Sequence, residues 1–157
     1  RLGLLYDPRY NSEFFTKAAM EAPSLGLKIV PLKVSSKKDI PIVLKQNWEN
    51  IDALWLIPDQ TVISESIVQY IVKEALFRKT PVIGYNRFFY ESGAALAFVF
   101  DYGELGRQVG RLAANVLSGK ACEKEIPVFR VWQILRVINK LGISVPEKKA
   151  PPIEAGP

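Results

Sequence analysis

The chain has 157 residues, of which 48% are hydrophobic and 24% charged, and its formal net charge is +5. This length corresponds to one domain, and the apolar fraction is high enough to exclude disorder for most of the chain. The single cysteine, Cys122, excludes an internal disulfide, and the absence of histidine excludes catalytic triads, imidazole bases and His-ligated metals, so most hydrolytic chemistry is disfavoured.

Short apolar runs with the character of β-strands alternate with longer helical segments along the chain. The predicted strands cover residues 2–6, 27–34, 52–58, 81–85 and 94–100, with a weaker strand at 126–131. Pro31 removes a backbone hydrogen-bond donor from the second strand, so we place that strand at an edge of the sheet. The apolar runs are much shorter than the ~20 residues that span a bilayer.

Helical spacing of apolar residues predicts a helix between successive strands. The predicted helices cover residues 12–22, 39–48, 86–92, 103–118 and 132–141, together with one that begins at Ser64. Ser12 is the expected N-cap of the first helix, and Pro23 is expected to end it. The helix at 103–118 carries an apolar stripe that is expected to face inward: Leu105, Val109, Leu112, Ala113, Val116 and Leu117.

This alternation, with central strands that are apolar on both faces, predicts an α/β fold with a doubly wound parallel sheet. We expect a Rossmann-like or flavodoxin-like three-layer sandwich formed by residues 1–146, followed by a flexible tail at 147–157. The sequence opens directly on a predicted strand, so we expect the chain to be part of a longer protein.

Ligands of open α/β sheets bind beyond the carboxyl ends of the strands, where the loops of this chain carry polar and aromatic residues. The candidate ligand-binding residues are Asp59, Gln60, Thr61, Tyr85, Asn86, Arg87, Tyr10 and Asn11. Each of them can equally be an ordinary helix cap or turn former. Asp59 is the strongest candidate, because Ser64 is better placed to cap the helix that follows it.

Other functions of this fold class lack their motifs. Acidic residues follow three strands, as in a phospho-receiver domain, but Tyr85 and Asp101 stand where that domain requires Thr or Ser and Lys. The first strand is not followed by a G-x-G-x-x-G motif, and the chain has no P-loop. Lys and Arg are scattered rather than gathered on one helix face, which disfavours nucleic acid as a partner. We expect no cofactor and no metal.

Five segments in order, residues 52–59, 80–84, 92–96, 101–119 and 141–146, resemble the second half of ABC-transporter substrate-binding proteins of the "ABC sub bind" family. The resemblance covers residues 1 to about 146. It departs from the family at Trp132-Gln133, where an Asn often precedes the last helix, and at Tyr85, where the family residue is often small and polar.

The resemblance implies a non-enzymatic, solute-binding component of an ABC-type uptake system. Such proteins close two Rossmann-like lobes on a small molecule, and this chain corresponds to the second lobe with its return segments. The implied partner is an ABC permease in the membrane, and the implied location is periplasmic or extracytoplasmic, with lipid anchoring as an option for the full-length protein. Some members of the family bind aromatic amino acids.

The candidate residues suit an amino acid or a similar zwitterion. The Asp59 carboxylate can pair with an ammonium group, and backbone N–H groups at the start of the helix after Gln60 and Thr61 can hold a carboxylate or another anion. Aromatic walls can come from Tyr10, Tyr85 and Phe88. Arg87 could instead contact an acidic ligand, and the sequence does not choose between the two.

In family members the helix at 103–118 usually packs on the other lobe. For the chain alone we predict a symmetric homodimer through 103–118 and the strand at 126–131, because the apolar stripe needs a cover. Two other functions remain open. The effector-binding core of a transcription regulator shares the fold but requires a DNA-binding segment, and an enzyme with Asp59 as general base lacks a second catalytic group at an obvious spacing.

Overall fold

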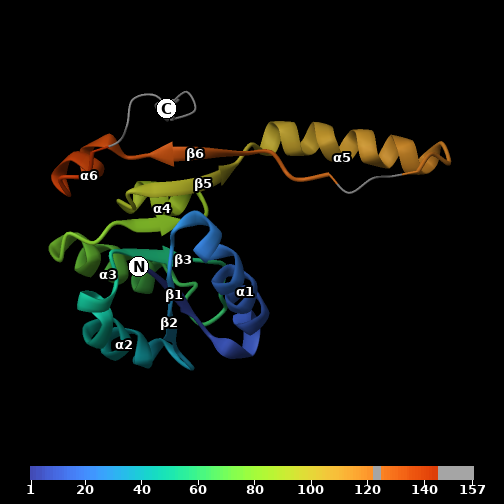
Figure 1. Ribbon diagram of the computed structural model, residues 1–157. Helices are drawn as coiled ribbons and strands as arrows, with labels where there is room; N and C mark the ends of the chain where they lie inside the picture. Colours follow the sequence, from blue (N-terminus) through green and yellow to red (C-terminus); the bar gives the residue numbers. More distant parts are fainter. Residues whose placement is uncertain (122–124, 145–157) are drawn as a thin grey trace.

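The structure is a computed structural model that describes residues 1–121 and 125–144 (Figure 1). Its strands are β1 (Leu2–Tyr6), β2 (Ile29–Lys33), β3 (Ala53–Leu56), β4 (Val82–Gly84), β5 (Leu96–Phe100) and β6 (Phe129–Gln133). Its α-helices are α1 (Pro8–Glu21), α2 (Ile40–Asn47), α3 (Glu65–Phe77), α4 (Arg87–Glu91), α5 (Tyr102–Leu117) and α6 (Leu135–Lys140). Short 3-10 helices form η1 (Ala22–Leu25), η2 (Lys37–Asp39) and η3 (Trp48–Asn50). Cys122 and the predicted tail at 147–157 lie outside the described residues.

The six strands form one sheet in the order β2-β1-β3-β4-β5-β6. The first five strands are parallel to their neighbours in the flavodoxin-like order, which confirms the predicted α/β fold. Pro31 lies in β2 at the edge of the sheet, as predicted. β6 pairs antiparallel with β5 and forms the other edge, so the sheet is mixed rather than wholly parallel.

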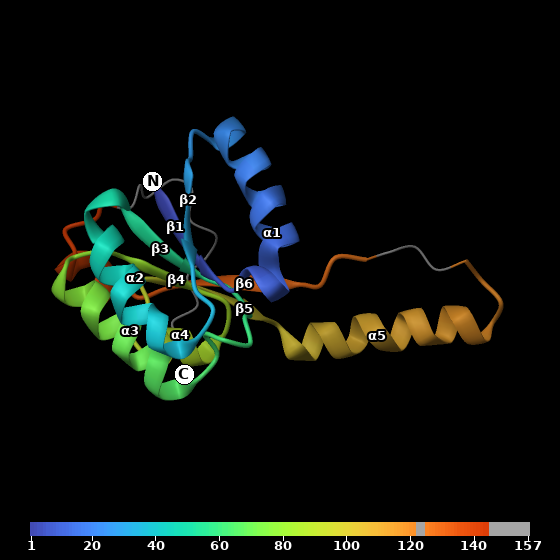
Figure 2. The ribbon, with the colours of Figure 1, turned by 90° about the horizontal axis from the view of Figure 1, so that it is seen from below.

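Helices cover both faces of the sheet (Figure 2). The main apolar core lies between the sheet and α2, α3 and α4, with Leu54 and Ile71 fully buried in it. A smaller core on the opposite face packs Leu4 and Tyr6 of the sheet against Phe15 of α1. The Tyr6 and Phe15 rings are stacked, with their centroids 5.0 Å apart.

The first helix begins four residues earlier than the sequence predicted. Asp7 is its N-cap and accepts a hydrogen bond from the backbone N–H of Arg9, while Pro8 occupies the first helical position, which proline favours. The backbone is non-helical at Asn11, so a kink lies just before Ser12. The prediction that Ser12 caps this helix was wrong because a proline in the first turn extends the helix back to the strand.

The C-terminal elements differ most from prediction. β6 begins three residues later than predicted, and α6 covers only Leu135–Lys140. Both views show α5 extending away from the sheet instead of packing on it (Figures 1 and 2). Within α5 only Gln108 is buried, whereas Val109 and Val116 are 57% and 62% exposed. The expectation that this stripe faces inward is therefore wrong for the chain alone.

Candidate functional site

The candidate site lies where the strand order reverses, between β1 and β3, which is the usual ligand position in doubly wound folds. Asp7 follows β1 directly, and Asp59 lies in the loop after β3. The two loops are joined, because the backbone N–H of Asp7 donates to Asp59 Oδ2 at 2.8 Å. Two carboxylates therefore stand side by side at the carboxyl edge of the sheet.

Asp59 is 3% exposed, and both of its carboxylate oxygens accept hydrogen bonds from the protein. Oδ1 accepts from the backbone N–H groups of Thr61 and Val62 at 2.9 and 3.3 Å. Oδ2 accepts from the N–H of Asp7 at 2.8 Å and from Asn11 Nδ2 at 2.7 Å. These four donors fill the acceptor positions of a carboxylate. Ser64 is the N-cap residue of α3, as the sequence predicted, while the Asp59 side chain organises the loop between β3 and α3.

The backbone N–H groups of the loop before α3 are occupied. Those of Thr61 and Val62 donate to the Asp59 carboxylate, and that of Ile63 donates to the Asp59 carbonyl at 2.9 Å. α3 begins only at Glu65, and the N–H groups of its first turn have no acceptor among the described residues. Binding of a ligand carboxylate at the start of this helix therefore stays a prediction.

Asp7 is fully buried and forms an ion pair with Arg9. Arg9 Nε lies 3.0 and 3.1 Å from the two carboxylate oxygens of Asp7, and Arg9 Nη2 donates to Oδ2 as well. The Thr61 hydroxyl donates to Asp7 Oδ2 at 2.6 Å, and Arg9 Nη2 also donates to the carbonyl of Ser35 at 2.6 Å. The loops after β1, β2 and β3 are thereby connected by one hydrogen-bonded network.

The network sets the ionisation of its members. The Arg9 guanidinium, hydrogen-bonded to Asp7, holds the pKa of that carboxyl well below its usual range despite burial. Asp7 in turn raises the pKa of Arg9, to which the charge of Asp59 contributes more weakly. Burial raises the pKa of Tyr85, with a further contribution from the negative charge of Asp59. Asp7 is consequently an anion and Tyr85 a neutral phenol across the physiological pH range.

Tyr85 and Asn86 extend the site toward β4. The Tyr85 ring packs against Phe89 at a centroid distance of 4.7 Å, and Asn86 Oδ1 caps α4 by accepting from the N–H of Phe89 at 3.2 Å. A cavity of about 220 Å³ lies between these residues and the start of α3, lined also by Ser64 and Phe88. The buried Ser64 hydroxyl has no hydrogen-bond partner within the described part of the chain.

The remaining predicted site residues are exposed on the same loops or on the helices that follow them. Gln60 is exposed, and Tyr10 is 51% exposed on α1 with the Arg9 guanidinium 5.5 Å from its ring centroid. Arg87 pairs with Glu91 one turn later in α4, at 2.7 Å. The structure thus joins Asp59, Thr61 and Asn11 directly, with Tyr85 near Asp59, while Arg87 makes only this local contact.

Sequence reasoning omitted Asp7 and Arg9 from the site. Asp7 was considered only as one of the acidic residues that follow three strands, and Arg9 was not singled out. One signal was available: an acidic residue that directly follows a buried strand needs a counter-charge, and Arg9 is the nearest cation in the sequence.

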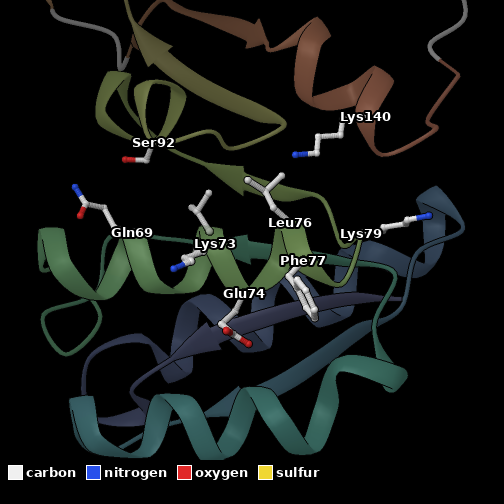
Figure 3. A pocket seen from close by; sticks show the side chains of 9 residues that line it. Gln69, Lys73, Glu74, Leu76, Phe77, Lys79, Ser92 and Lys140 are labelled. Atoms are coloured by element: carbon white, nitrogen blue, oxygen red, sulfur yellow. The ribbon is translucent and has the colours of Figure 1, made fainter.

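A larger cavity of about 600 Å³ lies elsewhere, between α3, α4 and α6 (Figure 3). Lys140 of α6 stands across it from Leu76 of α3, and Lys73 and Ser92 also line it. This groove holds none of the predicted site residues and lies on the helical flank rather than at the carboxyl edge. We therefore place the candidate site at the Asp7–Asp59 network despite the smaller cavity there.

The described residues contain no group of three or more His, Cys, Asp or Glu side chains that could hold a metal ion. Within the same residues, no helix combines the length and the apolar character that crossing a membrane requires.

The family described as "ABC transporter substrate binding protein" matches residues 1–148. The chain belongs to this family. A curated relative, the tyrosine-binding protein of Clostridioides difficile strain R20291, is 26% identical over 145 residues, covering 89% of this chain and 40% of the relative.

Solved structures of similar fold come from three bacteria. The ABC domain of Streptococcus pneumonia in complex with L-Trp has a TM-score of 0.71 and 23% identity over 93% of this chain and 51% of its own. A conserved domain protein of Vibrio cholerae has a TM-score of 0.67 and 24% identity, again over 93% of this chain and 51% of its own. The ligand-free, open form of a substrate-binding protein with adhesive properties from Clostridium difficile has a TM-score of 0.70 and 23% identity, over 94% and 52%. The chain thus spans about half the length of these three proteins and shares their fold.

Proposed function

We propose that residues 1–146 form one lobe of a two-lobe, extracytoplasmic substrate-binding protein that binds an amino acid and delivers it to an ABC permease. Family membership supports the role in transport, because proteins of this family bind solutes outside the cytoplasmic membrane and are not enzymes in general. The relatives named for tyrosine and for a complex with L-Trp support an amino acid as the ligand. Nothing in the structure favours the effector-binding core of a transcription regulator over this role.

The observation that carries the proposal is the excess of acidic groups in the Asp7–Asp59 network at the carboxyl edge of the sheet. Asp7 and Asp59 are two buried carboxyl groups, and within the described residues Arg9 is the one cation paired with them, so acidic groups outnumber basic ones in this network. A negative potential at the mouth of a cleft attracts a ligand ammonium group. Because the Asp59 oxygens are already bonded to four protein donors, Asp59 acts on the ligand through its field more than through a direct contact.

The cavity beside this network supports a ligand with an apolar or aromatic side chain. Tyr85, Phe88 and Val68 supply apolar walls, and Asn86 and the unpaired hydroxyl of Ser64 supply polar groups at its rim. Its volume of about 220 Å³ suits half of a site whose other half comes from a second lobe. Tyr10 of α1 and Gln60 of the loop after β3 are exposed at the same edge of the sheet and can contact the ligand there.

The exposed residues of α5 support the proposal that the full protein has a second lobe. This helix leaves the sheet with Val109, Val116 and Leu117 of its apolar stripe exposed, and the chain covers only 51% of the pneumococcal structure. We propose that the other lobe covers the stripe, in preference to a second copy of this chain, because the relatives are about twice as long.

Binding by the two-lobe protein tests the function. Thermal unfolding measured with each of the twenty amino acids should show stabilisation by one or a few of them, with L-Tyr and L-Trp as the first probes. A ligand present at 100 times its Kd stabilises the folded state by about 2.7 kcal/mol, which such a measurement detects.

Neutral sugars, which lack both charged groups, provide the control and should leave the unfolding temperature unchanged. A shift with sugars and none with amino acids would contradict the proposal.

A further inference from the structure

Arg9 stands out at the carboxyl edge as a cation that the protein holds in place while leaving one of its donors unused. Nε and Nη2 donate to the Asp7 carboxylate, and Nη2 also donates to the carbonyl of Ser35 at 2.6 Å. Among the described residues, Nη1 has no acceptor. The guanidinium is thus fixed from two loops and retains a free pair of N–H groups.

Exposure distinguishes Arg9 from a purely structural counter-ion. The Asp7 side chain is 1% exposed, whereas that of Arg9 is 61% exposed. If Arg9 served only to neutralise a buried carboxylate, covering it together with its partner would strengthen the pair. The structure instead leaves the outer side of the guanidinium open at the edge where ligands of this fold bind.

The preorganisation of Arg9 suits it to a planar anion. A guanidinium recognises a carboxylate through N–H groups in a fixed fork, and little side-chain entropy is lost when that fork is already held. Arg87 is the other arginine among the candidate residues, but it is bound only to an exposed glutamate of its own helix. Arg87 therefore lacks the bracing that two separate loops give to Arg9.

We propose that Arg9 binds the carboxylate of the amino-acid ligand, and that Asp7 is a positioning residue that holds the guanidinium for this contact. The inference rests on the proposed function and deepens it. It also supplies a charged anion receptor at an edge where the backbone N–H groups of Thr61 and Val62 are committed to Asp59. The adjacent Tyr10 ring, 5.5 Å from the guanidinium carbon, provides an apolar neighbour for the bound ligand.

The test compares acids with carboxamides in the two-lobe protein. Calorimetric binding is measured for the twenty L-amino acids and for their carboxamides, which keep the ammonium group and lose the carboxylate. For the amino acid that binds, Arg9→Met should weaken binding by about 10- to 100-fold, as expected for loss of a charge-assisted hydrogen bond. The same variant should change binding of the matching carboxamide by less than about twofold.

Two further variants keep the test informative. Arg9→Lys retains the charge but not the fork, so it should recover only part of the affinity for the acid. Arg9→Met leaves the Asp7 carboxylate buried without its partner, so the double variant Asp7→Asn/Arg9→Met serves if the single variant does not fold. Lys17→Met, which removes a positive charge from the exposed face of the same helix, is the matched control and should bind as wild type does.

The outcomes separate this inference from the proposed function. If Arg9→Met binds the acid as well as wild type does, or weakens acid and carboxamide equally, the carboxylate contact is overturned while amino-acid binding stands. Equal weakening would assign Arg9 to lobe closure instead. If the wild-type protein binds no amino acid, both the function and the contact fail.

Discussion

At the scale of single residues, hydrogen-bond donors stabilise two carboxylates that are buried close together. Asp7 and Asp59 are 0% and 3% exposed, and burial of an unpaired charge is strongly unfavourable. Asp7 is stabilised by an arginine and a hydroxyl, whereas Asp59 is stabilised by three backbone N–H groups and one amide. The two carboxylates are thus kept at the edge of the sheet by donors from the segment after β1 and from the loop after β3.

Replacing Asp59 with Asn should therefore affect folding as well as binding. Asn keeps an oxygen for the N–H groups of Thr61 and Val62, but it places an NH₂ group against the donors of Asp7 and Asn11. We expect the free energy of unfolding to fall by about 1–3 kcal/mol, measured by urea denaturation, because buried donors lose their acceptor. Glu13→Gln, at an exposed position of α1 paired only with Lys17, should change it by less than about 0.5 kcal/mol. Equal stability of Asp59→Asn and wild type would contradict the role given to these hydrogen bonds.

At the scale of elements, periodicity predicted the order and type of nearly every strand and helix. It did so because the central strands and the helices that cover them are buried in one core, which imposes a regular apolar pattern. It failed where a local interaction sets the boundary, as at Asp7 and Pro8, which start α1 before its apolar pattern begins. The network of Asp7, Arg9 and Asp59 could not be predicted from periodicity either, because it joins loops that are 52 residues apart in sequence.

A close contact between β4 and α4 gives a prediction at this scale. A Cβ atom at Gly84 would lie 2.3 Å from the Cβ of Phe89, which is 2% exposed in the main core. Gly84→Ala should therefore force Phe89 to move and destabilise the protein by about 1–3 kcal/mol, measured by urea denaturation.

Gly106 provides the matched control for this substitution. It lies in α5 with nothing within 4 Å of an added Cβ, so Gly106→Ala should be neutral or stabilising by up to about 1 kcal/mol. If Gly84→Ala is as stable as the wild-type protein, the α4 segment adjusts freely. That result would contradict the view that Tyr85 and Asn86 are held rigidly at the site.

At the scale of the whole molecule, the described residues leave apolar side chains exposed on β5, β6 and α5. Phe98 and Phe100 of β5 are 36% and 43% exposed, and Phe129 of β6 is 48% exposed. α5 projects from the same end of the sheet (Figure 2), and its Val109, Val116 and Leu117 side chains are exposed. An exposed apolar surface of this continuity marks an interaction site. No sequence pattern could have shown where α5 points, because the pattern specifies an apolar face but not the surface that covers it.

Substitutions of the exposed apolar residues of α5 can show whether a second lobe or a second copy of the chain packs on this helix. In the two-lobe protein, Val109→Asp and Val116→Asp should each lower the free energy of unfolding by about 1.5–3 kcal/mol, because a side chain buried against the other lobe becomes charged. Ala114→Asp, at an exposed position on the opposite side of α5, is the control and should have little effect.

Sedimentation of the 157-residue chain distinguishes the two alternatives further. If a second copy covers the stripe, the chain should sediment as a dimer that Val116→Asp converts to a monomer, and the two-lobe protein should tolerate the same substitution. If the other lobe covers it, as we propose, the sensitivity should appear in the two-lobe protein, because only there does α5 find its apolar partner.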